Sequence, residues 1–247
     1  MAQCAMAKFG QESAFVSPWM VRLIAREFGT TTERTEALLA NTRLHADTVF
    51  DPNLLITIPT LVQVFANVSE TVGEDWALRL PATWSEGSQA EFGLAIRSAP
   101  DVGHVLDIWS EYAHTRWPMA HFVRIVESDR VKILVKRNFH IAPDTWKSIV
   151  LLLSLNTFVM INSISDQFHK SVFLEYGFDR PSCYESFAKV ITSGIAWNCK
   201  DTSVAILRSA LTQKLPYGDA RSFAIAVDAL RERAAQIATT VTYTKVH

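Results

Sequence analysis

Residues 100–136 read PDVGHVLDIWSEYAHTRWPMAHFVRIVESDRVKILVK, and within this stretch a helical pattern gives way to a strand pattern. In the second half, two runs rich in Val and Ile flank Ser128 and Asp129, and apolar side chains alternate with Lys132 and Lys136. Alternation with a period of two on both sides of a turn predicts a β-hairpin.

The first half of the stretch predicts an amphipathic helix. Pro100 and Asp101 are typical of a helix start, and the helical spacing continues to about Thr115. The polar face carries His104, Asp107, Glu111 and His114. Its two histidines lie about 15 Å apart along the axis, which is too far for both to hold one metal ion. We therefore expect a solvated helix face and no metal site.

Three further helices are predicted before this stretch, over residues 18–28, 31–41 and 59–71. The first two superficially resemble a helix-turn-helix unit. Four arginines between Val16 and Asp47 are balanced by four acidic residues, however, so we expect no DNA contact there.

After the hairpin, residues 149–161 form an apolar run that is too short to span a membrane and contains Ser154, Asn156 and Thr157. We interpret it as a buried core helix. Beyond it the patterns predict strands over residues 172–176, 195–199 and 204–207 and a helix over residues 182–190. Residues 200–202 are expected to turn between the last two strands.

A final helix is predicted from Asp219, with an apolar seam at Phe223, Val227, Leu230, Ala234 and Ile237. We take Phe223, Val227 and Leu230 as candidates for self-association. The whole pattern predicts an α+β fold, in which a helical N-terminal layer packs on a modest, mostly antiparallel sheet with interleaved helices.

The composition is that of a folded chain. It has 247 residues, 49% of them hydrophobic, and a net charge of −1, so it is neither disordered nor basic enough to suggest nucleic-acid binding. Its three cysteines fit neither a disulfide framework nor a CxxC pair, and the N-terminus lacks a secretion signal. We expect a cytoplasmic protein without a membrane segment.

Common catalytic signatures are missing from the sequence. It contains no GxSxG, GxxxxGK[ST], GxGxxG or HExxH pattern, so we expect no catalytic residues, no metal and no cofactor. Aromatic residues are plentiful, and several can line a ligand pocket between sheet and helices. The candidate ligand-binding residues are Trp109, Tyr112, Phe139, Trp146, Tyr176 and Trp197.

Two stretches, residues 91–118 and 172–216, resemble the N-terminal effector domain of AraC/XylS-type transcription regulators. In the first, the residues that fit the family pattern are Gly93, Leu94, Ser98, Pro100, Gly103 and Leu106. In the second, they are Phe173, Pro181, Tyr184, Phe187, Leu211, Leu215 and Pro216.

The resemblance implies a domain that binds a small-molecule effector, forms a homodimer and reaches DNA only through a C-terminal domain. After Ala235 only QIATTVTYTKVH follows, so we expect an excised or naturally truncated sensor domain. The sensing domain would span residues 16–240, divisible into a helical subdomain 16–86 and an α+β subdomain 87–240. Residues 1–15 and 241–247 would be loosely ordered. A cofactor-independent enzyme and a pure protein-interaction module remain the alternatives.

Overall fold

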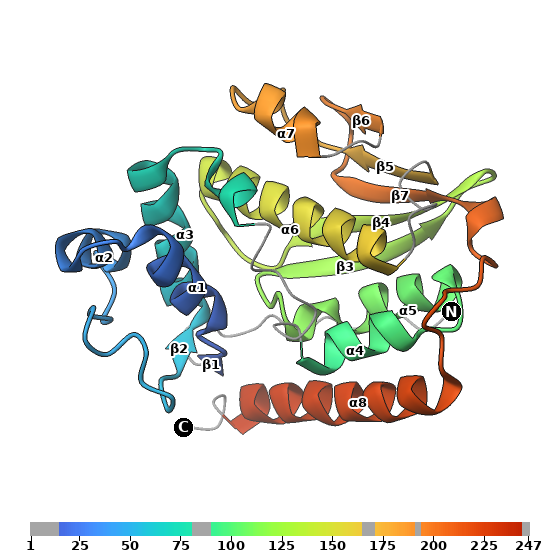
Figure 1. Ribbon diagram of the computed structural model, residues 1–247, viewed down its shortest axis with the longest axis horizontal. Coiled ribbons are helices and arrows are strands. Elements are labelled where there is room, and N and C mark those ends of the chain that lie inside the picture. The colour runs from blue at the N-terminus through green and yellow to red at the C-terminus, as the bar shows by residue number, and fades with distance from the viewer. Residues whose placement is uncertain (1–14, 81–89, 165–170, 191–193, 244–247) are drawn as a thin grey trace.

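The computed structural model describes residues 15–80, 90–164, 171–190 and 194–243. Most of both expected loose ends, residues 1–14 and 244–247, lies outside these ranges, as does most of the proposed subdomain boundary near residues 85–90. Helices and a mostly antiparallel sheet make up the described part (Figure 1), which confirms the α+β prediction.

The main sheet has five strands in the order β3-β4-β7-β5-β6, and only the β5–β6 pair is parallel. The strands are β3 (Ala120–Val126), β4 (Arg130–Arg137), β5 (Val172–Glu175), β6 (Gly194–Ala196) and β7 (Ser203–Leu207). The predicted hairpin is confirmed, since β3 and β4 are paired and the Glu127 N–H donates to the Arg130 carbonyl at 2.9 Å.

The two last strands are neighbours in sequence but not in the sheet. β5 lies between β6 and β7, because the chain after β6 crosses the end of β5 before it returns as β7. Backbone bonds hold this crossing: the Tyr176 N–H donates to Ala196 and the Cys199 N–H donates to Tyr176, both at 2.9 Å.

Three helices at the N-terminal end agree with the predicted ranges: α1 (Trp19–Phe28), α2 (Thr32–Leu39) and α3 (Ile58–Val72). Thr31 caps α2, because its hydroxyl accepts a hydrogen bond from the Arg34 N–H. A small two-stranded sheet, β1 (Phe15–Val16) with β2 (Ile56–Thr57), ties this helical group together.

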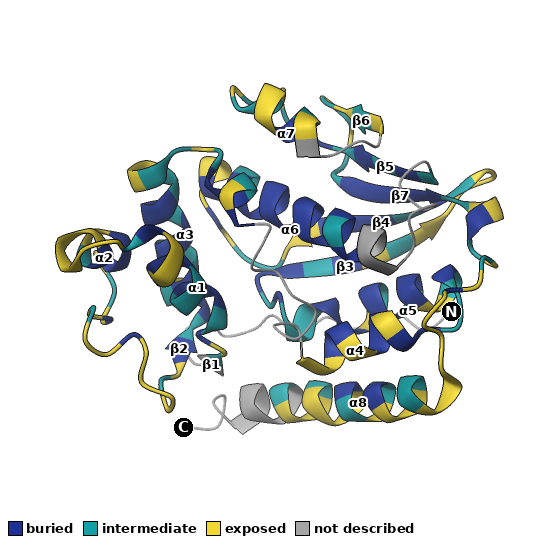
Figure 2. Cartoon of the chain, viewed as in Figure 1, coloured by how far each residue is buried: buried dark blue, intermediate teal, exposed yellow. Residues whose placement is uncertain are grey.

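Helices α5 (Val102–Tyr112) and α6 (Pro143–Ile164) pack on one face of the main sheet. The Asp101 carboxylate caps α5 by accepting from the His104 N–H at 3.2 Å. In α6, residues 148–158 are all buried (Figure 2), as expected for a core helix. In the described ranges, the structure contains no helix with the length and apolar character that a membrane crossing requires.

The remaining helices are α4 (Ala90–Ser98), α7 (Tyr184–Val190) and α8 (Ala220–Tyr243). α8 runs beside α4 along the edge of the molecule, and α5 lies between these helices and the sheet (Figure 1). α8 continues to Tyr243, three residues into the segment expected to be a tail.

Candidate functional site

A small cavity lies where α5, α6 and the main sheet meet. Its volume is about 10 Å³, close to the minimum that one buried water needs. α5, the sheet and α6 all contribute to its wall, which consists of Leu106, Trp109, Phe122, Ile133, Val135, Leu153, Ser154, Thr157 and Val204.

The sequence patterns explain why these side chains meet. Leu106 and Trp109 are three residues apart on the apolar face of α5. Ile133 and Val135 share one face of β4 because strand side chains alternate. The cavity therefore forms between an amphipathic helix, an alternating strand and a helix that is buried on all sides.

Trp109 is the largest side chain in the wall. It is only 3% exposed, and its ring packs edge-to-face on Phe92 and Phe122 at centroid distances of 5.2 and 5.7 Å. Its indole Nε1 is also buried and has no hydrogen-bond partner in the described part of the chain. A buried N–H without an acceptor is costly, and this one belongs to a residue of the cavity wall.

Two hydroxyl groups supply the other polar atoms of the wall. Ser154 and Thr157 donate to the carbonyls of Val150 and Leu153, both at 2.8 Å, so their oxygens are left to accept. The hydroxyl of Tyr176 approaches Ser154 without a hydrogen bond of normal geometry. Burial raises the pKa of Tyr176, an effect that Ser154 partly opposes, and the phenol stays protonated.

The six predicted ligand-binding residues are not all at this cavity. Trp109 is part of its wall, and Tyr176 lies one side chain behind it, stacked on Trp197 at 4.4 Å. Tyr112 is buried one turn along α5 and contacts Arg231 of α8 instead. Phe139 and Trp146 pack against the core without lining the cavity.

Sequence reasoning missed most of the wall because its members are ordinary core residues. Ile133 and Val135 were visible only as the inward half of an alternating strand. Ser154 and Thr157 are the residues from which the site could have been predicted, since their hydroxyls interrupt an otherwise apolar run. The missed residues are Leu106, Phe122, Ile133, Val135, Leu153, Ser154, Thr157 and Val204.

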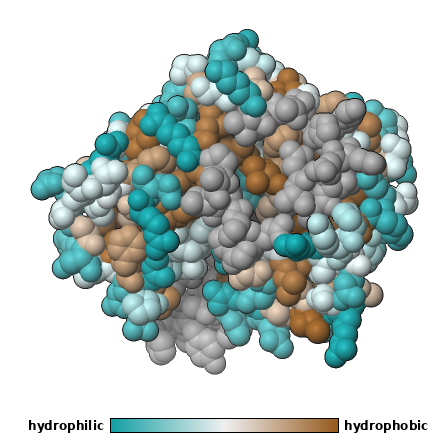
Figure 3. Space-filling view, viewed as in Figure 1, coloured by the Kyte–Doolittle hydropathy of each residue, from teal (hydrophilic) through white to brown (hydrophobic). Residues whose placement is uncertain are grey.

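The predicted apolar seam of α8 packs within the chain. Leu230 is 1% exposed, and Phe223 and Val227 are partly buried against the core. Figure 3 shows hydrophobic side chains on the visible face in small separate groups between hydrophilic ones. The described residues of the seam therefore pack, in part, on α4 and α5.

The polar face of α5 makes ordinary ion pairs. Asp107 pairs with Arg124 of β3, and His104 Nδ1 lies 2.6 Å from Asp101 Oδ1. Burial acts to raise the pKa of Asp101, but hydrogen bonds with His104 and Lys214 outweigh it and lower that pKa. Among the described side chains, no three His, Cys, Asp or Glu residues are placed to hold a metal ion.

Among the described residues that line the cavity, none is acidic or basic or carries a thiol. General acid–base or nucleophilic chemistry needs such groups within reach of a substrate. These lining residues supply van der Waals contacts and few polar groups to a molecule in the cavity.

Residues 34–215 match the family model described as the arabinose-binding domain of AraC transcription regulators, N-terminal. No curated protein matches the chain.

Among solved structures, the transcriptional regulator CdpR from Pseudomonas aeruginosa is similar, with a TM-score of 0.62 at 12% identity. The match covers 89% of this chain and 65% of that regulator, so the chain spans less than two thirds of its length. At this identity the likeness establishes the fold alone. The family match covers most of the sequence, and the chain belongs to the family of N-terminal arabinose-binding domains of AraC transcription regulators.

Proposed function

We propose that this domain senses a small molecule in the cavity between α5, α6 and the sheet, on behalf of a transcription regulator. The observation that carries the proposal is the unpartnered Trp109 indole in the wall of a neutral, enclosed cavity. Sites for small ligands are usually lined mainly by apolar side chains, with a few polar groups that fix the orientation of the ligand.

The size of the cavity suggests how binding is transmitted. Room for about one water means that any larger molecule must bind a state in which the walls have moved apart. A ligand shifts the equilibrium towards that state by its higher affinity for it. Sensing is thus a population shift that moves α5 or α6.

α5 connects the cavity to α8. Leu106 and Trp109 line the cavity, whereas the His104 ring lies 5.5 Å from the Phe223 ring and the Tyr112 hydroxyl lies close to Arg231. A displacement of α5 would therefore change the packing of the helix that ends the described chain.

The segment that leads into α8 also contacts the start of α5 through a hydrogen bond and an ion pair. The Gly103 N–H donates to the Leu211 carbonyl at 2.8 Å, and Lys214 lies 3.3 Å from Asp101. We infer that α8 passes the signal to a DNA-binding domain outside this chain, within a cytoplasmic homodimer. The two described cysteines, Cys183 and Cys199, are free, which suits a reducing compartment.

A ligand screen with two matched valine variants tests the site. Val204→Ile adds a methylene in the cavity wall, and Val172→Ile adds the same group on the same sheet face away from the cavity. Overpacking costs both variants about 1–3 kcal/mol. We expect metabolites that raise the Tm of the parent and of Val172→Ile and leave Val204→Ile unchanged. Equal stabilisation of all three proteins, or none of the parent, would contradict the proposal.

A further inference from the structure

The chemistry of the cavity wall restricts what can bind there. Seven of its side chains are aliphatic or aromatic, and the other two are the hydroxyls of Ser154 and Thr157. None of these nine described side chains carries a charge. The wall therefore offers van der Waals contact over most of its area and polar contact at few points.

An ionic effector finds no partner in this wall. A buried carboxylate or ammonium is unfavourable unless an opposite charge or several hydrogen bonds accompany it. The basic residues that could serve an acid are not in the wall: Arg124, the register neighbour of Ile133, pairs with Asp107. His140 is exposed, and Arg180 pairs with Glu185 at 2.7 Å. Arg208 is also exposed and donates to the Ser128 carbonyl at 3.4 Å.

A sugar fits no better, despite the name of the family. Each sugar hydroxyl brings a donor that needs an acceptor once water is excluded. Ser154 and Thr157 already donate to their own helix, so their oxygens can accept only from a few ligand donors. Most hydroxyls of a pentose would stay unpaired against Leu106, Val135 and their neighbours.

The polar atom that a ligand can satisfy is the Trp109 indole N–H, which is buried and unpartnered. We propose that the effector is an uncharged, mainly apolar molecule with one hydrogen-bond acceptor, such as a carbonyl oxygen, that receives the Trp109 Nε1 proton. This proposal rests on the sensing function proposed above and names its ligand class.

Four small probes separate the ligand classes. Acetophenone is neutral with a carbonyl, toluene lacks the acceptor, benzoate is charged, and L-arabinose is the sugar of the family name. Each is titrated into the purified chain while the Trp109 indole ¹H–¹⁵N resonance is followed, assigned by its absence in Trp109→Phe. We expect acetophenone to shift this resonance and bind most tightly, toluene to bind more weakly, and benzoate and L-arabinose to leave it unchanged.

Trp109→Phe isolates the hydrogen bond. It keeps an aromatic ring in the wall and removes the N–H, so acetophenone affinity should fall about three- to tenfold, the effect of one hydrogen bond. Toluene affinity should change little beyond the effect of the smaller ring. Because the walls must open for either probe, the ratio of the two affinities cancels that common cost.

Failure of the ligand class is distinguishable from failure of sensing. Binding of benzoate or L-arabinose that Val204→Ile abolishes would overturn the ligand class and leave sensing in the cavity intact. An unchanged acetophenone-to-toluene ratio in Trp109→Phe would overturn the role of the indole. If no probe shifts the resonance and the metabolite screen also yields no cavity-dependent stabilisation, both proposals fail.

Discussion

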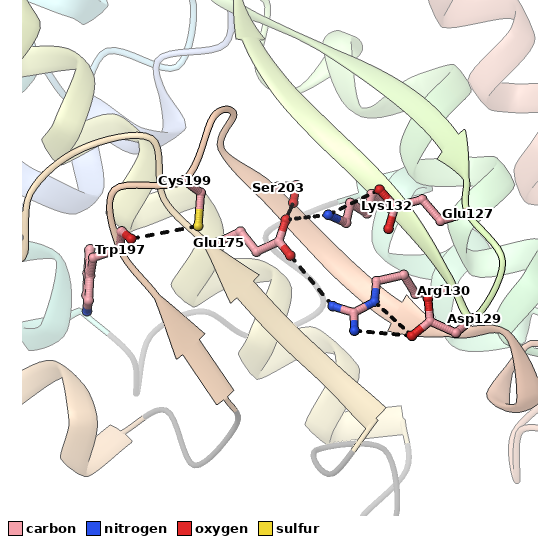
Figure 4. Close-up of polar contacts among 8 residues, drawn as sticks. All are labelled: Glu127, Asp129, Arg130, Lys132, Glu175, Trp197, Cys199 and Ser203. Atoms are coloured by element: carbon pink, nitrogen blue, oxygen red, sulfur yellow. Dashed lines mark hydrogen bonds and ion pairs between the residues drawn. The ribbon is translucent and has the colours of Figure 1, made fainter.

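The two faces of the main sheet differ in the charged groups that they carry. One face carries Val131, Ile133 and Val135 of β4 and packs against α5 and α6 around a neutral cavity. The other carries ion pairs (Figure 4): Lys132 lies 2.9 Å from Glu175 and 3.2 Å from Glu127, and Arg130 contacts Asp129 and Glu175.

One alternating strand produces both faces, because successive side chains of β4 point to opposite sides. On the ion-paired face, the carboxylates neutralise the cations and the charges remain partly hydrated, with 17–29% of the Glu175, Lys132 and Arg130 side chains exposed. On the helix face, none of the described residues that line the cavity is charged, and the buried Trp109 N–H has no partner among the described groups. We infer that function lies on the side where hydrogen-bond partners are scarce.

An isoleucine-to-lysine substitution on each face should give the largest difference in the free energy of unfolding. Ile133→Lys places a charge in the cavity wall beside Arg124, its register neighbour, and should cost roughly 3–5 kcal/mol or prevent folding. Ile125→Lys, on the ion-paired face and 39% exposed, should cost less than about 1 kcal/mol. Urea unfolding of both variants measures the difference. Similar losses would mean that the two faces do not differ as described.

Removal of the Trp109 ring should have the next largest effect. Trp109→Ala loses the contacts with Phe92 and Phe122 and should cost about 3–5 kcal/mol. Phe173→Ala, on the ion-paired face, removes a partly buried ring and a contact with Arg130 at 5.5 Å and should cost clearly less. Chemical denaturation provides the comparison, and equal costs would argue against a tightly packed cavity face.

The ion-paired face should give a smaller, pH-dependent effect. Burial acts to raise the pKa of Glu175, but hydrogen bonds with Lys132 and Ser203 outweigh it and lower that pKa below its ordinary value of 4.5. The stabilisation is therefore present above pH 4.5 and lost as the pH falls through the lowered folded pKa. Lys132→Met should cost about 0.2–1 kcal/mol at neutral pH.

The stability cost of Lys132→Met should be smaller in acid, because the parent protein also loses the Lys132–Glu175 ion pair there. Stability measured by urea unfolding at pH 7 and pH 3 tests the expectation, with Lys136→Met as the control because Lys136 is exposed on the same strand. If the difference in unfolding free energy between Lys132→Met and the parent is the same at pH 7 and pH 3, the ion pairs do not stabilise the fold.

The sequence predicted the elements better than the site. Helix α5, the β3–β4 hairpin and the buried helix α6 follow from local periodicity, because each pattern depends on neighbouring residues. The insertion of β5 between β6 and β7 does not, since strand order depends on contacts between distant residues. Of the predicted pocket residues, the sequence placed Trp109 on the apolar face of its helix but could not show which apolar residues leave a gap.

The self-association candidates also show that a sequence pattern does not identify the surface on which an apolar seam packs. An apolar seam at Phe223, Val227 and Leu230 packs equally well on the chain itself or on a second copy, and the sequence pattern is identical in both cases. In this structure, its described residues pack, in part, on α4 and α5. Only the three-dimensional arrangement decides between these uses.

The central claim is that one small molecule binds in the cavity on the helix-covered face. Native mass spectrometry of the purified chain with a stabilising compound from the metabolite screen tests it most directly. The account predicts one molecule per chain on the parent protein and on Val172→Ile, and none on Val204→Ile. Equal occupancy of Val204→Ile, or no bound molecule on the parent, would contradict it.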